Sequence, residues 1–255
     1  MTQKLLDIKG KKVLVLVGVV LVGAIAISKG ILTVYTGINI LAALTALVLH
    51  EVAHGLVALY YGDHTAHRAG RLSLSPKAHI DPFGTVILPL LLLLLGFPPF
   101  GYAKPVPVNL AVVRHRKRAE TVVALAGPIT NLLLAIAAGL ALKILLFSNK
   151  YQGYTSLTTS GFTATSFMAY FLLFFGVVNV IYFVLNIIPL PPLDGSALLR
   201  VVVGPKRYES IASKMKYGIP LLLFVVFLFP GVFGLIFSPF EHLWLSIFVP
   251  NGIVL

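Results

Sequence analysis

The sequence contains no cysteine and few acidic side chains. Of its 255 residues only eight are Asp or Glu, and charged residues of both signs make up 11%. The absence of cysteine excludes disulfide bonds and thiolate metal ligands. A soluble globular chain carries about 25% charged residues, so this chain has too few to cover a water-facing surface. Hydrophobic residues make up 58%, and several apolar runs approach or exceed the ~20 residues that cross a bilayer. The composition predicts an all-α polytopic membrane protein.

The excess of basic residues, a net charge of +12, does not indicate nucleic-acid binding. The Lys and Arg residues stand between apolar runs, where cytoplasmic loops contact anionic lipid. Most of them form four groups, at Lys4–Lys12, Arg68–Lys77, Arg114–Arg118 and Arg200–Lys216. We therefore expect a multi-pass integral membrane protein with its N-terminus in the cytoplasm and the lipid bilayer, not nucleic acid, as its surroundings.

Five apolar runs predict membrane crossings. They are Val13–Leu32, Gly37–Tyr60, Thr121–Phe147, Ser166–Ile188 and Tyr217–Phe237. We expect the first to be a retained helix and not a signal peptide, because no convincing small-residue cleavage site follows it. A sixth run, Phe83–Phe97, is short and contains Pro89. Since both of its flanks are predicted to be cytoplasmic, we expect a re-entrant or irregular segment there.

The polar connections suggest little further structure. Arg71-Leu72-Ser73-Leu74-Ser75 alternates between polar and apolar residues, which predicts a small membrane-associated β element. The prolines of Gly101–Asn109 push their predecessors out of the helical region and predict an extended stretch. Ser148–Thr165 is a loop rich in Gly, Ser and Thr. We expect one membrane-embedded domain over residues 1–255.

The second predicted crossing contains the pattern His50-Glu51-Val52-Ala53-His54. Residues four apart lie on one face of a helix, so both imidazoles can bind one metal ion. Glu51 can reach a metal-bound water without being a ligand. The pattern also arises by chance in soluble helices. Within a bilayer, however, each ionisable group costs about 2.5–3.5 kcal/mol, so a polar cluster without function is the weaker interpretation.

A catalytic zinc ion needs a third protein ligand and an open position. Asp194 directly follows the crossing that ends at Ile188, at the same predicted depth as the two histidines. The prolines between them break the helix, which membrane proteins tolerate where the backbone lines an aqueous cavity. Asp194 is therefore the best candidate, and the alternative is a helix-ending turn at Asp194-Gly195. Six other acids stand in predicted loops or at helix ends: Asp7, Asp63, Asp81, Glu120, Glu209 and Glu241.

Three motifs together resemble one protein family. HEVAHG (residues 50–55), AGPITN (126–131) and NIIPLPPLDG (186–195) are similar to the site-2 protease family of intramembrane zinc metalloproteases. GRLSLSPKAHIDPFGT (70–85) and GYAKPVPVN (101–109) resemble a compact bacterial or archaeal branch of that family. We expect neither the PDZ-like insertion nor the regulatory nucleotide-binding repeats that larger members carry.

The resemblance implies a function and a site. One Zn²⁺ per chain is expected, bound by His50, His54 and Asp194, with Glu51 as catalytic acid and base. The implied fold has about six transmembrane helices, with a catalytic core at about residues 37–198. The implied activity is that of a zinc metalloendopeptidase in a prokaryotic cell membrane. It would hydrolyse peptide bonds within or near the transmembrane segments of single-pass membrane proteins, in regulated intramembrane proteolysis.

Further residues are candidates for substrate contact. Asn186 is a candidate catalytic residue that contacts the oxyanion or the substrate, and the alternative is a helix cap. Asn131 is a weaker candidate, with a hydrogen bond between helices as the alternative. A strand can receive an unwound substrate by strand addition. The strand residues proposed for this role are Arg71, Leu72, Ser73, Leu74 and Ser75.

Two other classes of function fit some of these features. Broken helices and buried ionisable groups also occur in transporters and channels, but Glu51 is the only acid deep in a predicted crossing, which favours a single site. A catalytically silent relative that binds zinc or client helices is the other alternative. The intact Glu51 argues against it.

Overall fold

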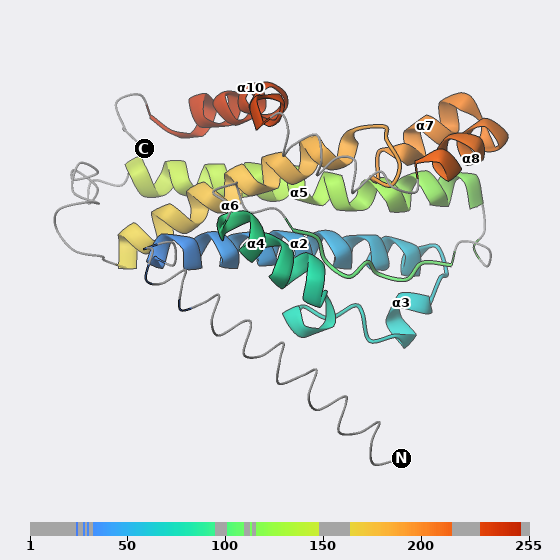
Figure 1. Cartoon of the computed structure of the whole chain (residues 1–255), viewed down its shortest axis with the longest axis horizontal. Coiled ribbons are helices and arrows are strands. Elements are labelled where there is room, and N and C mark those ends of the chain that lie inside the picture. The colour runs from blue at the N-terminus through green and yellow to red at the C-terminus, as the bar shows by residue number, and fades with distance from the viewer. Residues whose placement is uncertain are drawn as a thin grey trace, which may run out of the picture.

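The computed structural model describes residues 24, 28, 30, 33–94, 101–109, 113, 116–147, 164–215 and 230–250. Within these ranges every regular element is a helix (Figure 1). The elements are α2 (Val34–Tyr60), α3 (Thr65–Arg68), η1 (Pro76–Ala78), η2 (Pro82–Ile87), α4 (Leu88–Leu94), α5 (Arg116–Phe147), α6 (Ala164–Ile187), α7 (Ser196–Val203), α8 (Pro205–Lys214) and α10 (Pro230–Phe248). The predicted crossing Val13–Leu32 and the loop Ser148–Thr165 lie almost entirely outside the described residues, as does the first part of Tyr217–Phe237.

Three long helices, α2, α5 and α6, lie side by side and form the body of the protein (Figure 1). Val34–Tyr60, Arg118–Phe147 and Ser166–Ile187 are long and apolar enough to cross a membrane. Three of the five predicted crossings therefore correspond to helices with the length and composition of a membrane span. The total of about six stays a prediction.

Small side chains let the three long helices approach closely. Ala42 and Ala46 of α2 and Ala138 of α5 are buried where they meet Phe175 and Tyr182 of α6. In a membrane the apolar lipid tails remove most of the hydrophobic drive for helix association, so close backbone approach and van der Waals contact hold helices together. This packing fixes how α2 is rotated against α5 and α6, and therefore where its polar residues point.

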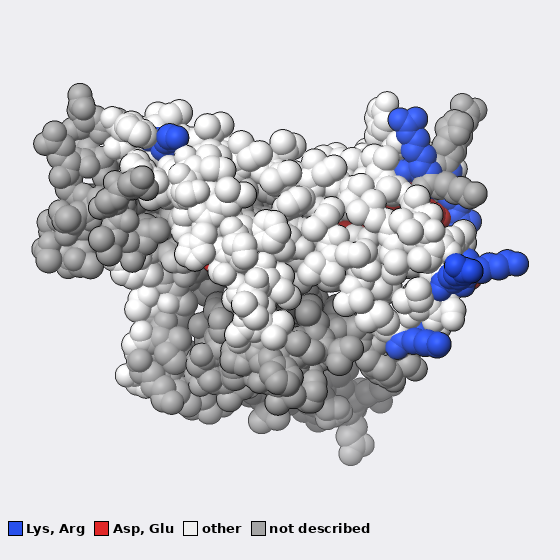
Figure 2. Space-filling view, turned by 90° about the horizontal axis from the view of Figure 1, so that it is seen from above, with Lys and Arg blue, Asp and Glu red and all other residues white. Residues whose placement is uncertain are grey.

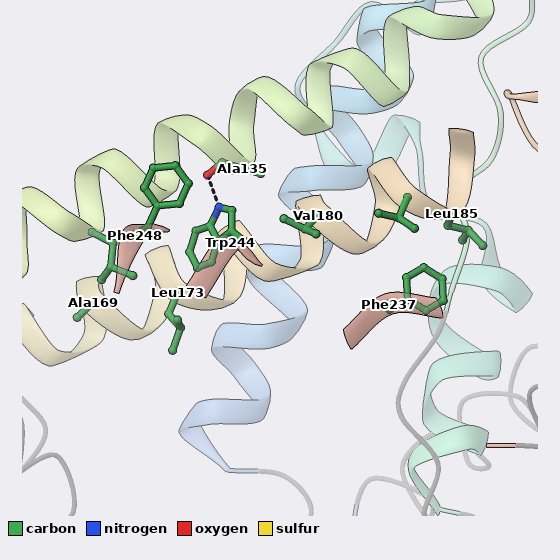
Figure 3. Close-up of a cluster of buried hydrophobic side chains, with 10 residues drawn as sticks. Ala135, Ala169, Leu173, Val180, Leu185, Phe237, Trp244 and Phe248 are labelled. Atoms are coloured by element: carbon green, nitrogen blue, oxygen red, sulfur yellow. Dashed lines mark hydrogen bonds between the residues drawn. The ribbon is translucent and has the colours of Figure 1, made fainter. Parts of the chain in front are cut away.

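Helix α10 covers α5 and α6 with aromatic side chains (Figure 3). Trp244 and Phe248 are buried, and the Trp244 indole donates a hydrogen bond to the Ala135 carbonyl over 2.9 Å. The structure describes the predicted crossing Tyr217–Phe237 only from Pro230 on, where α10 begins, and this helix extends through Pro239 to Phe248, beyond the predicted end. A membrane helix tolerates an internal proline when neighbouring helices pack around it, and here the residues beyond the proline form the contact.

The apolar run that begins at Phe83 is irregular, as predicted. Asp81 caps its start by accepting hydrogen bonds from the N–H groups of Phe83 (3.0 Å) and Gly84 (2.7 Å). The chain then forms a π-helical turn, η2, before continuing as α4. The apolar helix Pro82–Leu92 is shorter than the three candidate crossings. Re-entry of this segment into the membrane stays a prediction.

The β element predicted at Arg71–Ser75 does not form: these residues have no regular secondary structure. The Arg71 side chain is buried and donates to three backbone carbonyls. The Ser75 N–H donates to the nearby Ser73 hydroxyl over 3.1 Å. Within the described part of the chain no neighbouring segment pairs with this stretch. A strand needs a second strand to pair with, and the alternating pattern of one segment gives no information about such a partner.

Charged side chains lie mainly at one end of the molecule. Figure 2 shows Lys and Arg gathered at the end formed by α7, α8 and the start of α5, with a belt between the two ends that is almost free of them. This distribution is typical of a membrane-embedded bundle whose basic loops lie on one side of the bilayer.

Candidate metal centre

Two histidines and one aspartate meet inside the bundle. His50 and His54, one turn apart on α2, are buried, and their Nε2 atoms lie 3.0 Å apart. The Asp194 Oδ2 lies 3.1 Å from His50 Nε2 and 3.3 Å from His54 Nε2. The residue that follows the fourth predicted crossing therefore lies beside the two histidines, although 140 positions separate Asp194 from His54.

A tight turn after α6 delivers Asp194. The Gly195 N–H closes this turn by donating to the Asn186 carbonyl over 2.6 Å. Any side chain at Gly195 would collide with the backbone carbonyls of Ile187 and Ile188. The turn therefore requires glycine directly after the aspartate, which explains the Asp-Gly pair in physical terms.

The three side chains fit a zinc ion. Tetrahedral zinc with bonds of about 2.0–2.2 Å separates its ligand atoms by roughly 3.3 Å, close to the 3.0–3.3 Å found here. Two imidazoles and one carboxylate are ligand types that catalytic zinc uses. A methyl group at Gly127 of α5 would lie 2.6 Å from His50 Nε2 and close to His54 Nε2. The glycine thus leaves a space beside the ligand nitrogens that any other residue would fill.

A chain of hydrogen bonds orients the His50 ring. Asn179 Nδ2 donates to the Phe175 carbonyl (2.7 Å), and Asn131 Nδ2 donates to Asn179 Oδ1 (2.7 Å). Asn131 Oδ1 lies 2.5 Å from His50 Nδ1. A carbonyl can only accept, so the Phe175 carbonyl sets the direction of every bond in this chain and leaves Nδ1 as the donor. The lone pair of Nε2 is then free for a metal ion.

His54 is oriented in the same way. Its Nδ1 lies 2.7 Å from the Val123 carbonyl of α5, which accepts and therefore requires a proton on Nδ1. Asn131, proposed as a substrate contact, is fully buried and bonds to His50 and Asn179. This matches the alternative, a hydrogen bond between helices.

The asparagine chain predicts a loss of metal affinity when it is broken. Asn131→Leu removes the acceptor of the His50 proton, and loss of such a partner typically lowers metal affinity about 10–100-fold. Competition with a zinc chelator measures this change. Asn39→Leu is the matched control, since Asn39 lies on α2 and forms no hydrogen bond with His50, His54 or Asp194. Native zinc affinity in Asn131→Leu would contradict the proposed orientation of His50.

Glu51 directly follows His50 on α2 and is half-buried. One oxygen of its carboxylate, Oε2, accepts a hydrogen bond from the Val106 N–H over 2.8 Å. It does not belong to the group of three side chains that could hold a metal ion. Its position suits the predicted role of a neighbour to the metal and not a ligand.

The other residues proposed to contact the substrate differ in how their side chains are placed. Asn186 is half-buried, and its Nδ2 donates to the Tyr182 carbonyl of its own helix over 3.0 Å. The Arg71 guanidinium donates to backbone carbonyls, whereas Leu74 is exposed. None of the hydrogen bonds formed among the described residues uses the N–H of Leu72 or Leu74.

Three residues near the site were not predicted from the sequence: Gly127, Asn179 and Val106. A polar residue in the middle of an apolar crossing could have pointed to Asn179, since buried polar groups in membranes are rare and usually functional. Gly127 stands next to Pro128 in a quoted motif, but nothing in its sequence context indicates that it faces the histidines.

A cavity of about 690 Å³ opens beside Asp194. It lies between the start of α5, the turn after α6, and helices α7 and α8. Glu120 lines it and forms ion pairs with Arg116 (2.9 Å) and Arg200 (3.0 Å). Arg118 also lines it and contributes a further positive charge. The cavity reaches the candidate ligand from the end of the molecule where basic residues gather.

Apolar helices around a His-His-Asp group, with a glutamate beside it, are the arrangement of a membrane zinc metalloprotease. Comparison with known proteins gives the same class. A family profile described as "Peptidase family M50" matches residues 38–229, which include all three motifs quoted above. The chain belongs to this family, the site-2 proteases.

Relatives with assigned names agree with this class. "Putative zinc metalloprotease YwhC" of Bacillus subtilis is 33% identical over 189 residues, which are 74% of this chain and 77% of the relative. Rip2 of Mycobacterium tuberculosis H37Rv, with the same description, is 30% identical over 211 residues (80% and 73%). Rip2 of Mycolicibacterium smegmatis is 29% identical over 201 residues (78% and 70%). No solved structure matches the chain significantly. The predictions of a zinc cofactor and of metalloprotease activity are confirmed.

Proposed function

We propose that the protein cleaves peptide bonds within or next to the transmembrane segments of single-pass membrane proteins, in regulated intramembrane proteolysis. The observation that carries this proposal is that His50 and His54 lie buried within an apolar helix long enough to cross a membrane. A metal held there acts at a depth that soluble proteases do not reach. We further propose a multi-pass arrangement in a prokaryotic membrane, with the N-terminus in the cytoplasm.

Each side chain has one role in this proposal. His50, His54 and Asp194 hold one zinc ion, which supplies a Lewis acid that activates water and polarises the scissile carbonyl. The Glu51 carboxylate takes a proton from the attacking water and delivers it to the leaving amide nitrogen. Asn186 steadies the substrate, and its half-buried amide at the turn before Asp194 supports this role.

The substrate must unwind before it is cut. A transmembrane helix holds each carbonyl in a hydrogen bond to the residue four positions on and surrounds it with side chains. The freed backbone groups need new partners in a bilayer. The N–H groups of Leu72 and Leu74, which have no partner among the described residues, support a receiving role for residues 71–75. The cavity beside Asp194 supports a position for the unwound chain on the side of the metal centre where basic residues gather.

Helix-weakening residues at the cut are expected to accelerate cleavage. Glycine is about 1 kcal/mol less favourable than alanine inside a helix, so a single Ala→Gly change there should raise kcat/KM by about fivefold. The assay uses purified protease and a single-pass substrate in liposomes. The same change placed at the far end of the transmembrane segment is the control. Equal rates for both substrates would contradict a need for unwinding.

The same cleavage assay tests whether residues 71–75 receive the unwound substrate. Leu74 is exposed, and Leu74→Pro removes an N–H that has no partner among the described residues, so it should slow cleavage while zinc content stays unchanged. Leu74→Ala keeps the N–H and should lose less activity. A native rate for a folded, zinc-loaded Leu74→Pro protein would exclude this stretch as the receiving edge.

A further inference from the structure

The segment Lys104-Pro105-Val106-Pro107-Val108 presents one isolated backbone donor. Proline carries no N–H, so the Val106 N–H has no neighbouring amide on either side. Each proline also keeps the residue before it out of the helical conformation. The Val106 amide therefore cannot be consumed by a local helix and remains available to a partner outside the segment.

That partner is the proposed proton carrier. The Val106 N–H donates to Glu51 Oε2 over 2.8 Å. The Val106 side chain is buried and lies against Gly55, one turn beyond Glu51 on α2. A methyl group at Gly55 would approach the Val106 Cγ1 atom to 3.1 Å and overlap the Leu72 side chain. Glycine at this position thus lets the segment lie close enough to α2 for its amide to reach the carboxylate.

A buried arginine holds the segment in place upstream of Val106. Arg71 is 9% exposed, and its guanidinium donates to the carbonyls of Lys104 (2.6 Å) and Pro105 (3.0 Å), and to that of Ala78. It has no carboxylate partner among the described residues. Burying a cation is unfavourable unless its donors find acceptors, and here the carbonyls just before Val106 accept from Nη2, while Nη1 donates to the Ala78 carbonyl and the buried Nε has no partner among the described residues.

Further hydrogen bonds fix both ends. The Lys104 N–H donates to the His79 carbonyl over 2.8 Å, and the Asn109 N–H donates to Asp63 Oδ2 over 2.5 Å. Burial by itself would raise the pKa of the Asp63 carboxyl. Hydrogen bonds from Thr65 and Asn109 outweigh that effect and hold this pKa below its ordinary value. Asp63 is therefore charged at neutral pH and anchors the downstream end.

We infer that the Val106 N–H is a positioning group for the reaction: it fixes Oε2 of Glu51 and thereby directs Oε1 toward the metal centre. This inference rests on the proposed role of Glu51. A hydrogen bond from an N–H to a carboxylate is stronger than one between neutral groups. Holding a reacting group in one orientation removes part of the entropic barrier. The motifs at residues 70–85 and 101–109 thereby gain a function, since their residues hold the Val106 N–H against the Glu51 carboxylate.

Val106→Pro tests the inference because it removes this N–H and retains an apolar side chain. The expected result is a fall of about tenfold or more in kcat, the usual scale for a catalytic group displaced slightly from its productive position, with KM and zinc content unchanged. Val108→Pro, which removes the next N–H of the same segment, is the matched control and should leave kcat unchanged. Val106→Ala keeps the N–H and should retain most of the activity. A native kcat in zinc-loaded Val106→Pro would overturn the inference.

Hydrogen exchange gives a second readout that does not depend on activity. Residues 104–108 contain only three N–H groups, those of Lys104, Val106 and Val108. Glu51→Leu removes the acceptor and should speed the exchange of the Val106 amide, whereas Glu51→Gln keeps an acceptor and should preserve its protection. Unchanged exchange in Glu51→Leu would overturn the inference, even if Val106→Pro fails to fold.

The two readouts also separate this inference from the proposed function. If Glu51→Gln were fully active, the proton role of Glu51 would be wrong, while the exchange result would still report the contact. If Glu51→Gln were inactive and exchange in Glu51→Leu were unchanged, only the bracing role of Val106 would fail.

Discussion

Glu51→Gln is expected to abolish cleavage and leave the zinc content unchanged. The carboxylate bonds to the Val106 N–H and is not one of the side chains that converge on the metal position. Glutamine is nearly isosteric and can still accept that hydrogen bond, but it cannot take a proton from water. Loss of general acid–base catalysis lowers rates by about 10²–10⁴-fold. Metal analysis and a cleavage assay on the same purified sample measure both quantities.

Ligand variants are the necessary comparison. His50→Ala, His54→Ala and Asp194→Ala should each lose zinc and activity together, because catalytic zinc needs all three protein ligands. The contrast between zinc-loaded, inactive Glu51→Gln and zinc-free alanine variants separates proton transfer from metal binding. Full activity in Glu51→Gln would contradict the mechanism, and zinc loss in that variant would make Glu51 a ligand.

Local patterns predicted much of the candidate site. The four-residue spacing of His50 and His54 depends only on helix geometry, so the sequence sufficed. Asp194 could be found because the chain has few acids and because topology places the end of the fourth predicted crossing at the depth of the histidines. The three long helices could be found because crossing a bilayer demands a length and a composition that short sequence windows reveal.

Features that depend on the rotation and neighbours of helices could not be predicted. Asn179 and Gly127 lie near the histidines because α6 and α5 turn those positions toward α2, and packing of small residues between the helices sets that rotation. The prediction of a strand at Arg71–Ser75 was wrong for a related reason. Its alternation is a local signal, whereas the burial of Arg71 depends on carbonyls more than thirty residues away.

The cost of the buried polar groups explains their connectivity. Asn131 and Asn179 are fully buried within the bundle, where an unpaired amide is expensive. Both amides take part in the chain that ends at His50, so the burial of one supports the burial of the next. A substitution that breaks the chain therefore affects the orientation of a ligand as well as the packing of the helices.

Gly127→Ala is expected to remove zinc from the protein. The added methyl would lie 2.5 Å from His50 Cε1 and 2.6 Å from His50 Nε2, and close to His54 Nε2. Real side chains essentially never approach so closely, so the imidazoles or the metal must be displaced. Both rings are held on their far sides by hydrogen bonds to α5, which prevents them from moving aside. Metal analysis should show near-complete loss of zinc, and cleavage should fall to the level of His50→Ala.

Two other glycines separate this effect from general damage to the helices. Gly139→Ala crowds the same helix α5 against the Phe248 ring, away from the site, and Gly37→Ala adds a methyl to α2 where nothing lies within 4 Å. Both variants should keep their zinc, although Gly139→Ala is expected to lower stability through overpacking by about 1–3 kcal/mol. Alanine is also a better helix former than glycine, so loss of zinc in Gly127→Ala would not reflect a weakened α5. A Gly127→Ala protein with full zinc content would mean that the metal does not lie between α2 and α5, and the assignment of His50 and His54 as ligands would then fail with it.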